Sequence, residues 1–195
     1  MIKDSLLGLQ KKVGDIFSVL PLHPNHITVL SVLFSAIGAY FIFEKNWIGL
    51  ACILLAFLFD GLDGAVARAK RLSSAFGAYL GGISDRLVEF FALLPFFFYP
   101  EFIFPSLLLV FFGTCMHSFS KAYADHREVL GAKSAAGLKS FLPRTERVIG
   151  IFAAVFLLII GEVSYAWYLL WLLAAVSVIA FCVLQLRVFD AAKKK

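Results

Sequence analysis

Residues 49–68 of this 195-residue chain read GLACILLAFLFDGLDGAVAR, an apolar run that leads directly into Asp60 and Asp63. Asp-Gly pairs are typical of turns in soluble proteins. Here the preceding apolar run favours a helix that continues through both aspartates. Charges inside an apolar helix are costly and are functional candidates by default. The stretch therefore predicts a membrane helix with an acidic end.

The rest of the chain is equally apolar. Its mean hydropathy is +0.88, and 61% of its residues are hydrophobic, against about 45–50% in a soluble domain. A helix needs about 20 apolar residues to cross a bilayer. The stretches that qualify are 26–43, 47–67, 79–98, 102–124, 146–161 and 165–187. We therefore expect an all-α, polytopic membrane protein with six transmembrane helices.

The N-terminal segment has a different pattern. Residues 3–19 alternate apolar side chains with lysine and aspartate, which indicates an amphipathic helix lying on the membrane surface. The expected organisation is an amphipathic juxtamembrane segment at 1–24, a six-helix transmembrane catalytic domain at 25–190, and a basic cytoplasmic tail at 191–195.

Lysine and arginine define an orientation. With six spans, both termini lie on one side of the membrane. Of the 18 basic residues, only Lys45 falls on the opposite side, and Arg86 lies near the start of the third span. The positive-inside rule therefore places both termini, and the acidic end of the second span, in the cytoplasm. This asymmetry explains the net charge of +5 without any nucleic-acid partner.

Polar and small residues share a face on each of two neighbouring spans. On the second span, the spacing i, i+3, i+4, i+7, i+8 puts these on one face: Asp60, Asp63, Gly64, Ala67 and Arg68. The third span repeats the arrangement with Gly77, Gly81, Asp85 and Glu89. A short connection makes the two spans antiparallel neighbours, so we expect the two faces to meet below the cytoplasmic surface.

The acidic residues Asp60, Asp63 and Asp85 suit a hard cation. Three nearby carboxylates do not all ionise unless a cation is present, and an all-oxygen set favours Mg²⁺, Mn²⁺ or Ca²⁺ over zinc. A pyrophosphate-containing substrate fits such a site. Two structural alternatives are open: Gly77-xxx-Gly81 as a helix-packing motif, and a salt-bridge cluster such as Asp63 with Arg68.

These residues resemble the signature of the CDP-alcohol phosphotransferase family, D-x2-D-G-x2-A-R-x8-G-x3-D-x3-D. The matching residues are Asp60, Asp63, Gly64, Ala67, Arg68, Gly77 and Asp85. The segment Pro24-Asn25-His26-Ile27-Thr28 also resembles the start of the family's first span. The resemblance implies metal-dependent transfer of a substituted phospho-group from a CDP-linked lipid to an alcohol, with release of CMP.

The resemblance also implies roles for individual residues. Mg²⁺ or Mn²⁺ is expected on Asp60 and Asp63, with Asp85 as general base or as a further ligand. The residues expected to bind the nucleotide and donor are Gly64, Ala67, Arg68, Gly77, Asn25 and Thr28. The family resemblance also favours a homodimer.

Position 81 departs from the signature, because the family has its third aspartate where this chain has Gly81. Three explanations are open. The chain uses one metal, with Asp85 recruited as a ligand; it is an inactive relative that only binds CDP-lipid; or position 81 carries an introduced substitution. Glu89 lies on the same face, two turns deeper.

Basic residues at the cytoplasmic ends of the fourth and fifth spans indicate the acceptor. Lys121, Arg144 and Arg147 are expected to bind a phosphorylated alcohol, although positive-inside topology also explains them. The segment 143–147 resembles that of family members that use inositol phosphate, so inositol phosphate is the expected acceptor, with glycerol phosphate and serine as alternatives. A non-enzymatic cation binder is a rival reading; a transporter is disfavoured because no second copy of the 60–85 pattern exists.

Overall fold

The structure is a computed structural model that describes residues 21–131, 137–138 and 140–193. Helices dominate the described residues, which contain no β-strand. The chain divides into two compact units, residues 1–92 and 93–195. The amphipathic segment expected at 3–19 lies outside the described residues, and the division of the sequence into segments 1–24, 25–190 and 191–195 stays a prediction.

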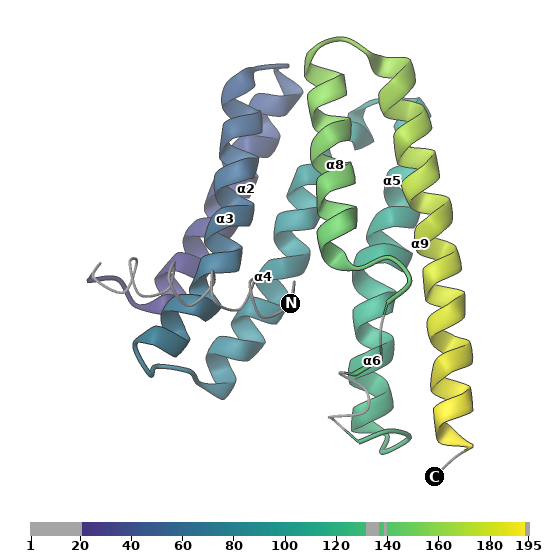
Figure 1. Cartoon of the computed structure of the whole chain (residues 1–195). Coiled ribbons are helices and arrows are strands. Elements are labelled where there is room, and N and C mark those ends of the chain that lie inside the picture. The colour runs from purple at the N-terminus through teal and green to yellow at the C-terminus, as the bar shows by residue number, and fades with distance from the viewer. Residues whose placement is uncertain (1–20, 132–136, 139, 194–195) are drawn as a thin grey trace, which may run out of the picture. The chain divides into compact units, whose positions relative to one another are not determined.

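The first unit contains three long helices (Figure 1): α2 (Pro24–Phe43), α3 (Trp47–Ala69) and α4 (Ala75–Leu93). Local signals define where they begin. The His23 side chain accepts a hydrogen bond from the Asn25 amide. Pro24 suits the first helical position, because a backbone N–H there would have no acceptor within the helix and proline lacks one. Asn46 caps α3 by accepting from the Ile48 amide.

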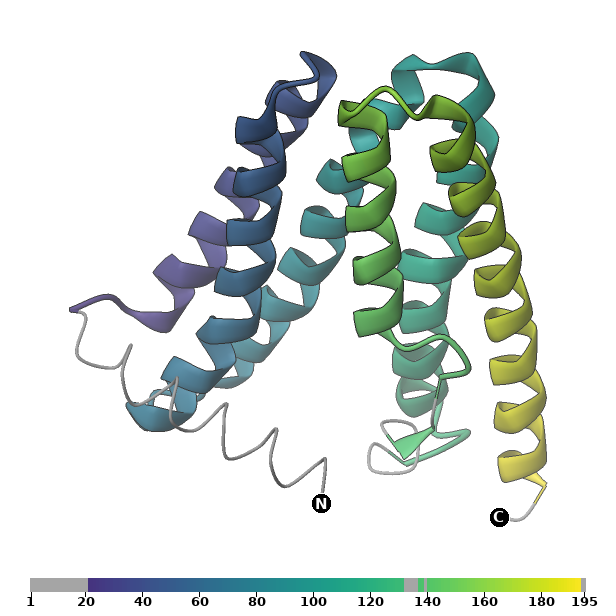
Figure 2. The ribbon, with the colours of Figure 1, turned by 45° about the horizontal axis from the view of Figure 1, so that its top comes forward.

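Helices α2 and α3 run side by side (Figures 1 and 2). Their closest approach depends on glycine, because a Cβ on Gly49 would stand 2.5 Å from the backbone nitrogen of Ile42. The buried Ser31 of α2 donates to the Thr28 carbonyl, and its hydroxyl lies 3.0 Å from that of Ser84 in α4. Such pairing lets polar side chains stay inside an apolar bundle.

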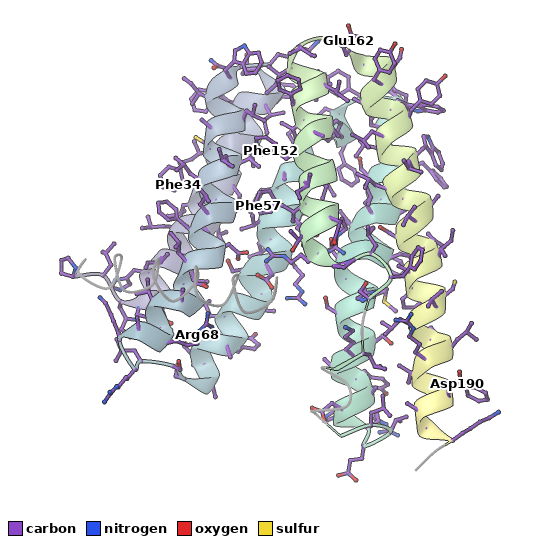
Figure 3. The ribbon with its side chains drawn as sticks, in the orientation of Figure 1. Phe34, Phe57, Arg68, Phe152, Glu162 and Asp190 are labelled. Atoms are coloured by element: carbon purple, nitrogen blue, oxygen red, sulfur yellow. The ribbon has the colours of Figure 1, made fainter. Side chains whose placement is uncertain are left out.

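The second unit contains η1 (Leu94–Phe98), α5 (Pro100–Leu108), the π-helical η2 (Leu109–Met116), α6 (His117–His126), α8 (Arg144–Ile159) and α9 (Val163–Ala192). Helix α9 packs against α8, η2 and α5. Figure 3 shows Glu162 at the turn between α8 and α9 and Asp190 near the far end of α9. Leu158, Leu170 and Ala174 are fully buried between these helices.

Four of the helical stretches are long and apolar enough to cross a membrane: Pro24–Phe43, Trp47–Ala69, Pro100–His126 and Val163–Ala192. Helix α4 carries Asp85, Arg86 and Glu89 within its 19 residues, and α8 is only 16 residues long. Each expected span overlaps a helix of the structure, but the third, expected at 79–98, is divided between α4 and the 3-10 helix η1 (Leu94–Phe98), and the count of six spans stays a prediction. Large apolar side chains such as Leu33, Leu58 and Leu172 are exposed, as expected where lipid is the solvent.

Candidate active site

A pocket of about 330 Å³ lies within the first unit, between the N-terminal ends of α2 and α4 and the C-terminal end of α3. Every residue that the sequence assigns to the donor site except Asp60 lines it. These residues are Asn25, Thr28, Asp63, Gly64, Ala67, Arg68, Gly77, Gly81 and Asp85. The pocket lies where these two antiparallel helices, joined by a short turn, direct their glycine- and aspartate-bearing faces toward each other.

Asp63 is held by two hydrogen bonds within the pocket. The Thr28 hydroxyl of α2 donates to its Oδ2 at 2.6 Å, and the amide of Gly64 donates to its Oδ1. The Thr28 bond links α2 to α3 across 35 positions of sequence. Because both bonds are to a carboxylate, they fix its orientation more firmly than bonds to a neutral acceptor do.

Asp60 lies one helical turn before Asp63 and is buried, with 8% of its surface exposed. It does not line the pocket. Within the described ranges, no three His, Cys, Asp or Glu side chains form a group that could hold a metal ion as they stand. The pocket thus presents two carboxylates, from Asp63 and Asp85, with a third buried behind them.

Asp85 forms an ion pair with its neighbour Arg86, with 3.2 Å between Oδ2 and the guanidinium nitrogen. Both side chains are about a third exposed, and Arg86 also donates to the Gly82 carbonyl. Sequence reasoning missed this arginine as a site residue because adjacent residues do not share a helix face. The guanidinium folds back along the helix, and this brings it to Asp85.

Gly81 faces Asp63 across the pocket. A Cβ built at Gly81 would stand 3.9 Å from Asp63 Oδ2, an ordinary contact, with no closer neighbour from outside its own stretch of helix. A carboxylate at this position would therefore have room and would lie beside Asp63. The pocket therefore has room for the third aspartate of the family signature, but Gly81 supplies no carboxylate oxygens there.

The other end of the pocket suits a phosphate-bearing ligand. A Cβ on Gly64 would stand 3.3 Å from an Arg68 guanidinium nitrogen, and one on Gly77 would stand 3.1 Å from the Ser74 hydroxyl. Ser74 accepts from the Gly77 amide at the start of α4. Figure 3 shows Arg68 near the C-terminal end of α3. The glycines keep this end open, and the guanidinium supplies positive charge.

The basic residues assigned to the acceptor lie in the second unit. Arg147, in the first turns of α8, is 6% exposed, and it lies within electrostatic reach of His117, as does Lys121. The Lys121 ammonium donates to the Leu138 carbonyl at 2.7 Å. Arg144 is the first residue of α8, three positions before Arg147 and on the same helix face.

A glycine lets Arg147 into the interior. A Cβ on Gly113 of η2 would stand 3.1 Å from Arg147 Cδ and 3.1 Å from Ser177 Oγ. Sequence reasoning gave His117 and Ser177 no role. His117 is half-buried, with an enclosed Nε2, and Ser177 is 1% exposed. No periodicity in the sequence predicts this grouping, because its members come from four segments, η2, α6, α8 and α9.

Comparison with known proteins identifies the family. The model of the CDP-alcohol phosphatidyltransferase family matches residues 21–184. The chain belongs to this family. It is accordingly a membrane transferase of phospholipid synthesis.

The chain is similar to several named relatives. It is 30% identical over 186 residues to the archaetidylinositol phosphate synthase of Pyrococcus horikoshii, covering 94% of this chain and 91% of that protein. It is 39% identical over 103 residues to a bifunctional IPC transferase and DIPP synthase of Aquifex aeolicus, covering 50% of this chain and only 23% of that much longer protein.

The fold is similar to that of the Mycobacterium tuberculosis phosphatidylinositol phosphate synthase with CDP-DAG bound. The TM-score is 0.75 at 24% identity, and the match covers 92% of this chain and 93% of that one. A second structure of that protein, in complex with manganese and citrate, gives a TM-score of 0.73 at 24% identity and covers 92% and 88% of the two chains.

Proposed function

We propose that this chain transfers the phospho-group of a CDP-linked lipid to inositol phosphate and releases CMP in a metal-dependent reaction. The observation that carries the proposal is a pocket in which the signature residues of two helices meet, with Asp63 and Asp85 on its wall. The inositol phosphate assignment is supported by the relative from Pyrococcus horikoshii, whose name gives archaetidylinositol phosphate as its product.

The nucleotide and diphosphate of the donor occupy the glycine-lined end of the pocket. Arg68 neutralises a phosphate, and the open backbone at Gly64 and Gly77 lets the ligand approach closely. Asn25 lies beside Gly77 at this end, Thr28 lines the pocket from the same helix, α2, and Ala67 keeps the α3 wall small. The lipid tails of the donor stay in the bilayer, because the helices around the pocket expose apolar side chains to lipid.

The donor set fits a hard divalent cation, Mg²⁺ or Mn²⁺, because it consists of carboxylate oxygens. Asp63 and Asp85 would hold it, with Asp60 behind them. When bound, such a cation neutralises the diphosphate and stabilises charge on the leaving CMP. The Thr28 hydroxyl orients Asp63 for this role, as outer hydrogen bonds do for metal ligands generally.

Asp85 acts as the general base. It accepts the proton of the acceptor hydroxyl as the hydroxyl oxygen forms its bond to the donor's phosphorus; the bond from that phosphorus to the oxygen of CMP breaks, and CMP leaves with the electron pair. Arg86 holds the Asp85 carboxylate in place through the 3.2 Å ion pair. Correct placement matters more than a large change in basicity for this step.

Lys121, Arg144 and Arg147 bind the phosphate of the acceptor. Arg147 is buried and carries a fork of donors suited to phosphate. Glycerol phosphate would satisfy the same cations, whereas serine would leave them without a phosphate. We therefore rank glycerol phosphate second and serine third.

The open space at Gly81 favours a second candidate function, a catalytically impaired member that binds CDP-lipid without turning it over. One carboxylate fewer weakens the hold on metal. The alternative that retains activity is a site with one bound cation, in which Asp85 is both a ligand of the cation and the general base.

We further propose that both termini and the active site face the cytoplasm, on the basis of the basic residues, and that the protein is a homodimer.

The direct test measures CMP release from a CDP-linked lipid with Mg²⁺ or Mn²⁺, offering inositol phosphate, glycerol phosphate and serine in turn. Release with inositol phosphate alone is the expected result. Release that persists in both Asp60→Ala and Asp85→Ala variants would overturn the assignment. Silence with all three acceptors, together with activity in Gly81→Asp, would establish the impaired alternative.

A further inference from the structure

Four enclosed side-chain atoms in the second unit have no hydrogen-bond partner among the described residues, and two of them, Nε2 of His117 and Oγ of Ser177, lie near the basic residues assigned to the acceptor. A buried polar group without a partner is destabilising, so its presence calls for a ligand or a water. Both residues lie beside Arg147. His117 is within its electrostatic reach. Ser177 and the Arg147 side chain both lie next to Gly113.

Four helical segments, η2, α6, α8 and α9, bring these groups together. Gly113 in η2, where the helix widens to the π form, accommodates both the Arg147 stem and the Ser177 hydroxyl. His117 opens α6 four residues later, and Lys121 follows after four more on the same face. The widened segment ends immediately before His117, and such segments are frequent at functional sites.

The first turn of α8 adds a second indication that the ligand is an anion. Arg144 and Arg147 occupy the N-terminal end of that helix, where the helix dipole disfavours positive charge. With Lys121 and His117 close by, the group combines cations with neutral donors. An oxygen-rich, multiply charged ligand matches this combination; an apolar one does not.

We propose that His117 and Ser177 complete the anion site of Lys121 and Arg147 by donating hydrogen bonds, from Nε2–H and Oγ–H, to phosphate oxygens of the acceptor. This rests on the proposed function and refines it. The two residues determine specificity by favouring a phosphomonoester-bearing alcohol over a neutral or zwitterionic one. They do not take part in the transfer of the phospho-group itself.

The test uses the full-length protein in lipid nanodiscs and measures binding of inositol phosphate, glycerol phosphate, inorganic phosphate and serine by calorimetry. His117→Ala and Ser177→Ala should each weaken binding of the phosphorylated ligands about tenfold, the effect of one hydrogen bond to a charged group. Binding of the CDP-linked lipid should be unchanged. His117→Gln, which restores an N–H donor, should recover part of the loss.

Matched controls separate ligand binding from packing. Ser106 is also fully buried and has no partner among the described residues, but it lies in α5, so Ser106→Ala should leave phosphate binding unchanged. His126, exposed at the end of α6, is the control for His117. Equal weakening in Ser106→Ala and Ser177→Ala, or parallel loss of CDP-lipid binding, would overturn the proposal.

The ligand arms distinguish this inference from the proposed function. If glycerol phosphate binds, inositol phosphate does not, and His117→Ala weakens the binding, then the anion site is supported and the inositol acceptor is refuted. If the wild-type chain binds CDP-lipid but neither phosphorylated alcohol nor inorganic phosphate, the anion site itself is refuted. Because binding is the readout, the result does not depend on whether Gly81 limits turnover.

Discussion

The acidic pocket of the first unit and the basic group of the second unit differ in the sign of their charge and in how far they are open to solvent. The pocket of the first unit is acidic, lined by glycines, and open enough that Asp85 is about a third exposed. The basic group of the second unit is enclosed, with Arg147 only 6% exposed. The first is formed largely by one helical hairpin, the second by η2, α6, α8 and α9. A pocket that exchanges a large lipid-linked ligand must be open, whereas a site that selects a small anion benefits from enclosure.

The largest expected effect separates the acidic pocket from the rest of the protein. Asp63→Ala removes a carboxylate that Thr28 orients, and we expect CMP release to fall by roughly 10³-fold, as when an electrostatic group of an active site is lost. Release should be measured in the wild-type and Gly81→Asp backgrounds. Asp190→Ala, at an exposed position near the end of α9, is the control; a comparable loss there would refute a special role for Asp63.

The second prediction concerns the enclosed cations. Arg147→Ala should weaken inositol phosphate binding about 100-fold, since it removes a buried, charge-assisted contact. Binding of the CDP-linked lipid should change little, because that ligand uses the pocket of the first unit. Calorimetry with both ligands checks the contrast. A variant that loses both affinities equally would show that Arg147 supports the fold rather than the acceptor.

The third prediction fills the gap in the acidic pocket. Gly81→Asp should tighten Mn²⁺ binding by roughly 10- to 100-fold, because each added carboxylate raises the affinity of an oxygen site. The space beside Asp63 accommodates the new side chain. Titration with Mn²⁺, followed by electron paramagnetic resonance, measures the change, and Gly81→Asn controls for size. Equal tightening in both variants would contradict a role for the added charge.

The smallest expected effect tests the link between α2 and the pocket. Thr28→Val keeps the side-chain shape but removes the 2.6 Å bond to Asp63, and Mn²⁺ affinity should fall by about tenfold, the lower end for an outer hydrogen bond to a metal ligand. Ser35→Ala is the matched control, because Ser35 lies on the same helix and its hydroxyl donates to the Val32 carbonyl rather than to a carboxylate of the pocket. An unchanged affinity in Thr28→Val would show that Asp63 is oriented without it.

The acidic pocket was accessible to sequence reasoning because its geometry is local. Asp63 and Asp85 lie on adjacent helices joined by a short turn, and helical periodicity alone puts Gly64, Gly77 and Gly81 on the facing sides. The Thr28 bond to Asp63 was not predictable in the same way, since it depends on how closely α2 packs against α3. The exclusion of Asp60 from the pocket wall likewise follows from packing, because spacing puts it on the same face as Asp63.

The sequence by itself determined that this is a helical membrane protein, which residues form its acidic face, and that position 81 lacks a carboxylate. These follow from composition, from the 3.6-residue period and from residue identity. Only the tertiary structure showed that Gly81 looks toward Asp63, that Arg86 pairs with Asp85, and that His117 and Ser177 stand beside Arg147. Those relations join residues on different helices or depend on side-chain direction, and neither periodicity nor composition specifies how helices distant in sequence meet.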